Sequence, residues 1–126
     1  MTLPLLSSVF AIIAGLIHVY IFVLESLRWR SPSVWRLFGV RSQEDAETLR
    51  PMAFNQGFYN LFLAAGVIAG LAFSGTRAGY GMAVLALASM LLAAVVLISS
   101  NRKMVVGAAI QGVPPLIALA GLAIPA

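Results

Sequence analysis

The chain has 126 residues, of which 61% are hydrophobic and only 10% are charged, and its formal net charge is +4. A soluble domain typically carries roughly 25% charged residues, so this composition excludes an ordinary water-soluble fold and indicates that lipid is the solvent. The chain contains no cysteine, which excludes disulfides, thiol nucleophiles and thiolate metal sites.

Four continuous apolar stretches are each long enough to cross a bilayer as a helix, which takes about 20 residues. They cover residues 3–24, 52–73, 80–100 and 104–124. The stretches lack the alternation of apolar and polar residues that is typical of membrane strands. We therefore predict an all-α membrane protein that forms a single domain, a four-transmembrane-helix up-down bundle.

The connection between the first two spans is the only long one, and residues 28–50 are predicted to contain a short interfacial helix. Ser31 can cap this helix, Pro32 suits its first position and Gly39 suits its end. Ser42 then begins a second capping pattern that is followed by acidic residues, so the next helix is expected to run nearly straight into the second span.

Basic residues are distributed unevenly among the connections, and this predicts the orientation of the chain. The first and third connections hold seven of them, namely Arg28, Arg30, Arg36, Arg41, Arg50, Arg102 and Lys103. The second connection holds only Arg77, and the tails hold none. Because positively charged connections stay in the cytosol, both termini are expected on the non-cytosolic side.

A GxxxG pattern, Gly66 to Gly70, lies on the second span. Its physical use is to let two helix backbones approach closely. Packing within the bundle is favoured over a dedicated dimer interface as the reason for this pattern.

Polar side chains inside the spans are the candidates for function, because polar groups in hydrocarbon are costly and often mark a site. On the first span, His18 and Glu25 are seven residues apart and share one face of a regular helix. They are the predicted catalytic pair, since an imidazole with a pKa of about 6.5 suits proton transfer. The predicted ligand-binding residues are Asn55, Gln56, Tyr59, Asn60 and Gln111.

These residues are expected to converge in the cytosolic half of the bilayer. At 1.5 Å per residue, His18 lies roughly 9 Å and Gln111 roughly 10 Å from the cytosolic ends of their spans. Asn55 and Gln56 lie at roughly 5 Å, and Asn60 at roughly 12 Å. The pattern predicts a polar-floored pocket that opens to the cytosolic side or to the inner leaflet.

Each of these residues also has a purely structural interpretation. His18 can bond to a backbone carbonyl, and Glu25 can pair with Arg28 one turn away. The amides can hold helices together, each contributing about 0.6 kcal/mol on average. The aromatic residues near the membrane surfaces are expected to act as anchors or packing groups rather than as a ligand cage; these are Tyr20, Tyr59, Trp29 and Trp35.

Several segments together resemble a known family. HVYIFVLE at residues 18–25, AFNQGFYNLFLAAG at residues 53–66, Trp29, Phe38-Gly39, and Gln111 with Pro114 are similar to domain of unknown function 1304 (DUF1304). The resemblance covers nearly the whole chain and implies four spans in a bacterial inner membrane. The chain is also distantly similar to the DoxX-like four-helix membrane proteins. The resemblance to DUF1304 implies no activity.

Three functions are compatible with this pattern. The first is binding of a lipophilic small molecule, with acid–base chemistry of the isomerase or hydrolase type at His18 and Glu25. The second is a small proton-coupled transporter or channel-like oligomer, and the third is a structural or accessory subunit. No motif in the sequence indicates which cofactor, if any, the protein uses. A His18–Glu25 metal site is not expected, because about 10.5 Å of helix rise separates the two residues. The expected partners are membrane lipids, a lipophilic ligand and further copies of the chain, but not nucleic acid.

Overall fold

The computed structural model describes residues 2–125, and all regular structure within them is helical. The elements in chain order are α1 (Leu5–Phe22), the π-helical turn η1 (Val23–Leu27), α2 (Pro32–Trp35), the 3₁₀ turn η2 (Arg36–Phe38), α3 (Gln43–Ala72), α4 (Arg77–Ser100), the 3₁₀ turn η3 (Arg102–Met104) and α5 (Val105–Gly121). The predicted all-α fold class is confirmed.

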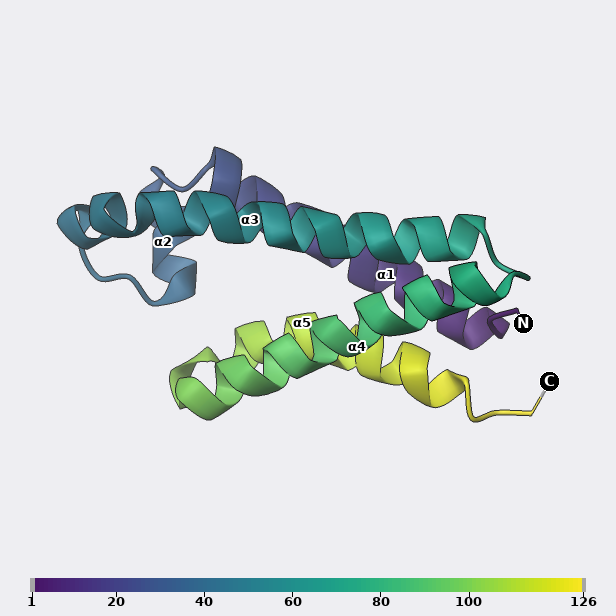
Figure 1. Ribbon diagram of the computed structural model, residues 1–126. Coiled ribbons are helices and arrows are strands. Elements are labelled where there is room, and N and C mark those ends of the chain that lie inside the picture. Colours follow the sequence, from purple (N-terminus) through teal and green to yellow (C-terminus); the bar gives the residue numbers. More distant parts are fainter. Residues whose placement is uncertain (1, 126) are drawn as a thin grey trace.

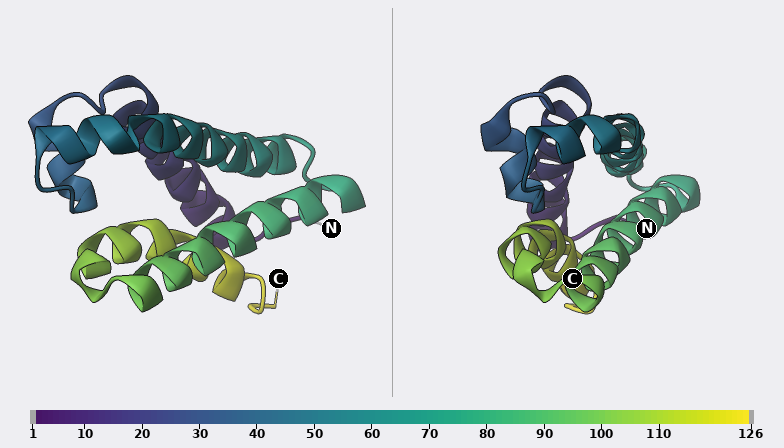
Figure 2. Two further views of the ribbon diagram at one scale, coloured as in Figure 1. Left: turned by 60° about the vertical axis from the view of Figure 1, so that its left-hand side comes forward. Right: turned by 90° about the vertical axis from the view of Figure 1, so that its left-hand side faces the viewer.

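The four long helices form a ring of contacts in which α1 and α4 each pack against both α3 and α5. Both ends of the chain lie at one end of the molecule, and α2 lies at the other (Figure 1). Helices α3 and α4 are joined by a short turn and diverge from it toward the α2 end, as both views in Figure 2 show. The backbones of α3 and α4 are therefore close at the turn that joins them and farther apart toward the α2 end.

Three helical segments within residues 2–125 are long and apolar enough to cross a membrane: Leu5–Leu27, Arg77–Ser100 and Arg102–Gly121. Only 33%, 28% and 28% of their apolar windows are buried inside the protein. Apolar surface exposed to this extent suits helices that cross a membrane. The other predicted span, residues 52–73, coincides with the second part of α3, which ends at Ala72, and is not among these three. Its apolar run is interrupted by the amides of Asn55, Gln56 and Asn60.

The connection before α3 follows most of the capping signals in the sequence. Pro32 begins α2 as predicted, whereas the Ser31 side chain makes no capping hydrogen bond. Gly39 ends the 3₁₀ turn with a positive φ of 79°, a conformation that suits glycine. The Ser42 hydroxyl accepts a hydrogen bond from the Asp45 N–H and caps α3. Helix α3 begins at Gln43 and passes through Pro51 without a break as far as Ala72, so the predicted helical continuation beyond residue 51 is confirmed.

A small apolar cluster forms the cap of the molecule at the α2 end. Its buried members are Leu24, Trp29, Val34, Trp35, Ala46 and Ala53. The Trp29 Nε1–H donates to the Ala46 carbonyl oxygen at 2.8 Å and so ties this segment to α3. Trp29 and Trp35 are therefore packing groups, which was one of the two roles expected of them.

Small residues dominate the central core, which contains Ala11, Ala14, Val67, Ala86, Leu87, Met90 and Ala118. Within the GxxxG pattern, Gly70 packs against the backbone of α4: an added Cβ would lie 2.6 Å from the Ala83 nitrogen. At Gly66 an added Cβ would lie 3.5 Å from the Ala86 Cβ. The pattern thus serves contact between α3 and α4 within one chain, as favoured from the sequence.

Candidate functional site

The first helix ends in a wide turn that carries two of its polar side chains toward α3. The Arg28 N–H donates to the Val23 carbonyl oxygen at 3.0 Å, five residues back, which defines a π turn. Such turns occur frequently at functional sites. Within it, the Ser26 hydroxyl donates to the Phe54 carbonyl oxygen at 2.7 Å. Gly57 permits this approach, because an added Cβ would overlap the Ser26 hydroxyl.

The half-buried Glu25 carboxylate accepts a hydrogen bond from the Asn60 Nδ2–H at 2.9 Å. The same Nδ2 group also donates to the Gln56 carbonyl oxygen at 3.1 Å. In the described part of the chain, the partner of Glu25 is thus an amide on α3, and no ion pair with Arg28 forms. Two predicted site residues from different helices are in direct contact.

His18 is 1% exposed, and its Nδ1 lies 2.8 Å from the Ala14 carbonyl oxygen, one turn back on α1. Since a carbonyl can only accept, Nδ1 carries the proton in this contact. The prediction that His18 and Glu25 share one face assumed a regular helix. The π turn that contains Glu25 changes the rotation per residue before Glu25 is reached. His18 and Glu25 have separate partners, and His18 lines none of the described cavities.

The remaining predicted ligand-binding residues are divided between α3 and α5. Asn55, Gln56 and Tyr59 are exposed on α3, whereas Gln111 is half-buried on α5. Only Gln111 lines the largest of the described cavities. The structure therefore brings Glu25 and Asn60 together and places Gln111 in a different cavity from Glu25.

The largest described cavity is a groove of about 500 Å³ between α1 and α5. From here on we call it the α1–α5 groove; its lining residues are Leu16, Ile17, Tyr20, Ile21, Leu24, Leu37, Phe38, Lys103, Met104, Val106, Gly107, Ile110 and Gln111. The 3₁₀ turn η2 and the turn between α4 and α5 close it at the α2 end. Its size lies within the range typical of small-molecule sites, about 300–1,000 Å³.

The polar side chains of the α1–α5 groove are few: Tyr20 on α1, and Lys103 and Gln111 on the side of α5. Lys103 lies at the turn before α5 and is exposed, whereas Gln111 lies roughly 12 Å farther along the helix axis, at 1.5 Å per residue. A mostly apolar wall with a few polar groups is the usual chemistry of a small-molecule site. This arrangement suits a molecule with an apolar body and one small polar group.

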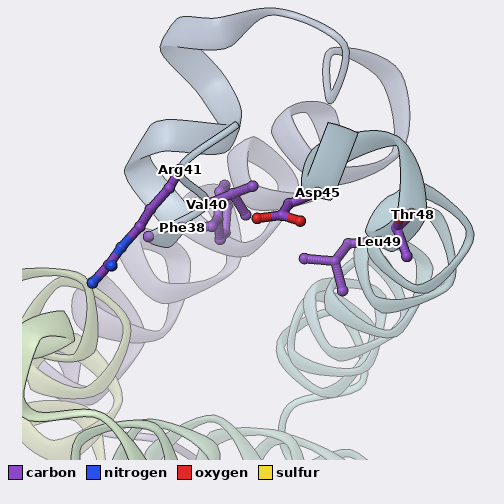
Figure 3. Close-up of a pocket in the computed structure, with 7 residues that line it drawn as sticks. Phe38, Val40, Arg41, Asp45, Thr48 and Leu49 are labelled. Atoms are coloured by element: carbon purple, nitrogen blue, oxygen red, sulfur yellow. The ribbon is translucent and has the colours of Figure 1, made fainter. Parts of the chain in front are cut away.

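Two other described cavities are smaller and more polar. One of about 390 Å³ lies between the segment after α2 and the start of α3, with Arg41, Asp45 and Thr48 in its wall (Figure 3). In Figure 3 the Arg41 side chain extends away from the Asp45 carboxylate. A third cavity of about 120 Å³ includes Glu25 and Arg50. In residues 2–125, no three His, Cys, Asp or Glu side chains gather as metal ligands would.

Sequence reasoning did not find the apolar wall of the groove. Leu16, Ile17 and Ile110 have the same chemistry as any lipid-facing residue, so no local signal distinguishes them. Tyr20 was interpreted as an anchor or packing group and Lys103 as an orientation signal, and both line the groove. Only Gln111 stood out, because an amide within an apolar helix is rare.

The fold and the groove define a small, all-helical class of protein whose helices are suited to a membrane. A family model described as protein of unknown function (DUF1304) matches residues 12–123, and the chain belongs to this family. The resemblance found in the sequence is thereby confirmed, whereas the more distant likeness to DoxX-like proteins stays a prediction. Comparisons with curated proteins and with solved structures give no match.

Proposed function

We propose that this protein binds a lipophilic small molecule in the α1–α5 groove. The supporting observation is the groove itself, which has a volume of about 500 Å³ and a mostly apolar wall that includes Gln111. Tyr20 and Leu16, at its edge, are 60% and 62% exposed, so the groove opens sideways toward the surrounding lipid. A ligand dissolved in the bilayer can therefore enter without first crossing water.

Binding is a better fit to this geometry than acid–base catalysis at His18. A general base must come within about 3.2 Å of the proton it takes, or reach it through one water. His18 is almost fully buried, and it is absent from the wall of every described cavity. Glu25 has a small cavity beside it, but that cavity is separate from the groove.

A matched pair of glycine variants tests this proposal. Gly107 lines the groove and has room for a side chain, because an added Cβ would lie 3.5 Å from the Met104 Cε. Gly81 on α4 is exposed, with no atom within 4 Å of an added Cβ. Gly107→Leu fills the groove, whereas Gly81→Leu adds the same side chain elsewhere.

The probe is a photoactivatable long-chain alcohol, added to the protein in mild detergent, with peptide mass spectrometry as the measurement. The wild type and Gly81→Leu should label on the groove-lining parts of α1 and α5. Labelling of Gly107→Leu there should fall about tenfold, which corresponds to about 1.4 kcal/mol of binding free energy. Equal labelling of all three proteins would mean that the probe reports only exposure to the detergent, and the proposal would fail.

We also propose that the chain crosses a bacterial inner membrane four times, with both termini on the non-cytosolic side. Helix α3 packs against both α1 and α4, which supports its role as the fourth span. The chain has no cysteine, so single cysteines can be labelled without background. A membrane-impermeant maleimide on intact spheroplasts should label Ser74→Cys but not Ser33→Cys or Ser100→Cys; the reverse pattern would refute this orientation.

A further inference from the structure

Two consecutive prolines interrupt the hydrogen bonding of α5 beside the groove. Pro114 and Pro115 lie inside this helix, and both are buried. Proline has no N–H, so a regular helix loses the bond to the carbonyl four residues earlier. The two carbonyls affected are those of Ile110 and Gln111, and both of these residues line the α1–α5 groove.

The Gln111 carbonyl loses more of its possible backbone N–H donors than the Ile110 carbonyl does. A tighter 3₁₀-type bond would come from the residue three positions later. For Ile110 that residue is Val113, which has an N–H, but for Gln111 it is Pro114, which has none. Neither regular donor exists for the Gln111 carbonyl, and the Pro115 ring also crowds this oxygen away from its usual place.

An acceptor without a donor is costly in a membrane, where no bulk water can replace the missing bond. Gln111 lines the groove, and its side-chain amide has a second carbonyl acceptor together with an NH2 donor. This part of the groove therefore offers hydrogen-bond acceptors. Lys103, the cationic donor of the groove, is exposed and lies roughly 12 Å away along the axis at 1.5 Å per residue.

We infer that the α1–α5 groove selects lipophilic molecules whose polar group is a neutral hydrogen-bond donor, a hydroxyl above all, and that the Gln111 backbone carbonyl accepts this bond. The inference rests on the proposed binding function and adds the chemical class of the ligand. The apolar body of the molecule lies against residues such as Ile17 and Ile110. Its hydroxyl reaches the acceptor that Pro114 and Pro115 leave free.

The test measures the dissociation constants of three probes that share one long alkyl chain: the primary alcohol, its methyl ether and the carboxylate. The wild-type protein should bind the alcohol about tenfold more tightly than the ether, the effect of one hydrogen bond in a site of low polarity. The alcohol should also bind more tightly than the carboxylate. These comparisons need no variant, so they hold even where a substitution harms folding.

Two proline variants then identify the acceptor. Pro115→Ala restores the N–H opposite the Gln111 carbonyl, so the preference for alcohol over ether should disappear while the ether binds as before. Pro114→Ala restores an N–H whose regular helical acceptor is the Ile110 carbonyl and leaves Pro115 opposite the Gln111 carbonyl. Because the new N–H can reach the Gln111 carbonyl only through a tighter 3₁₀-type bond, the preference should fall less than in Pro115→Ala. A preference that survives in Pro115→Ala would overturn the assignment to Gln111.

The outcomes separate this inference from the proposed function. Equal binding of alcohol and ether by the wild type, or tighter binding of the carboxylate, would overturn the inference and leave the binding function standing. No binding of any probe, or binding that is unchanged in Gly107→Leu, would overturn the binding function itself.

Discussion

The two glycines of the GxxxG pattern differ in what a methyl group would meet, and this gives a sharp prediction. In Gly70→Ala, the new Cβ would lie 2.6 Å from the Ala83 nitrogen and 2.8 Å from the Gly79 carbonyl oxygen. Both are backbone atoms, so α3 and α4 must move apart. In Gly66→Ala, the new Cβ meets only the Ala86 Cβ, at 3.5 Å, which is ordinary contact.

The magnitude follows from a comparison of the two variants. Each replaces glycine by alanine inside the same helix, so the gain in helix propensity, about 1 kcal/mol, is common to both and cancels in the difference. What remains is the cost of overpacking at Gly70, about 1–3 kcal/mol. Gly70→Ala should therefore have a free energy of unfolding lower than that of Gly66→Ala by this amount.

Reversible unfolding in mixed micelles, with increasing sodium dodecyl sulfate and helical circular dichroism as the signal, measures this difference. The oligomeric state of both variants should equal that of the wild type, because the pattern serves contact within one chain. Equal stability of the two variants, or a change of oligomeric state in both, would refute the reasoning.

The remaining predictions also use matched pairs. Trp29→Phe should lower the free energy of unfolding by about 1 kcal/mol more than Trp35→Phe. The reason is that Trp29 Nε1–H donates to the Ala46 carbonyl oxygen, whereas Trp35 Nε1 is buried without a partner within residues 2–125. Thermal unfolding followed by tryptophan fluorescence measures the difference, and equal losses of stability would contradict the prediction. Asn60→Leu should destabilise the protein by about 1 kcal/mol through loss of the bond to Glu25, whereas Asn55→Leu, at an exposed position, should be neutral or stabilising. The same micelle titration tests this second pair, and a greater loss in Asn55→Leu would count against the described contacts.

Local chemistry in the sequence was enough to predict much of the fold. Apolar runs predicted long helices, because backbone polar groups in lipid must bond within their own segment. Gly39 and Ser42 predicted the end of one turn and the start of α3, because positive φ and N-capping are local properties of these residue types. The glycines of α3 likewise predicted close helix packing.

Tertiary structure alone decided how the polar residues are grouped. Depth along the helix axis suggested that the amides converge, but depth does not fix the direction in which a side chain points around that axis. The π turn redirected Glu25 and Ser26 toward α3, and the burial of His18 gave its ring a carbonyl partner. The groove arises from the way α1 and α5 pack, so it depends on distances between helices that no local pattern contains.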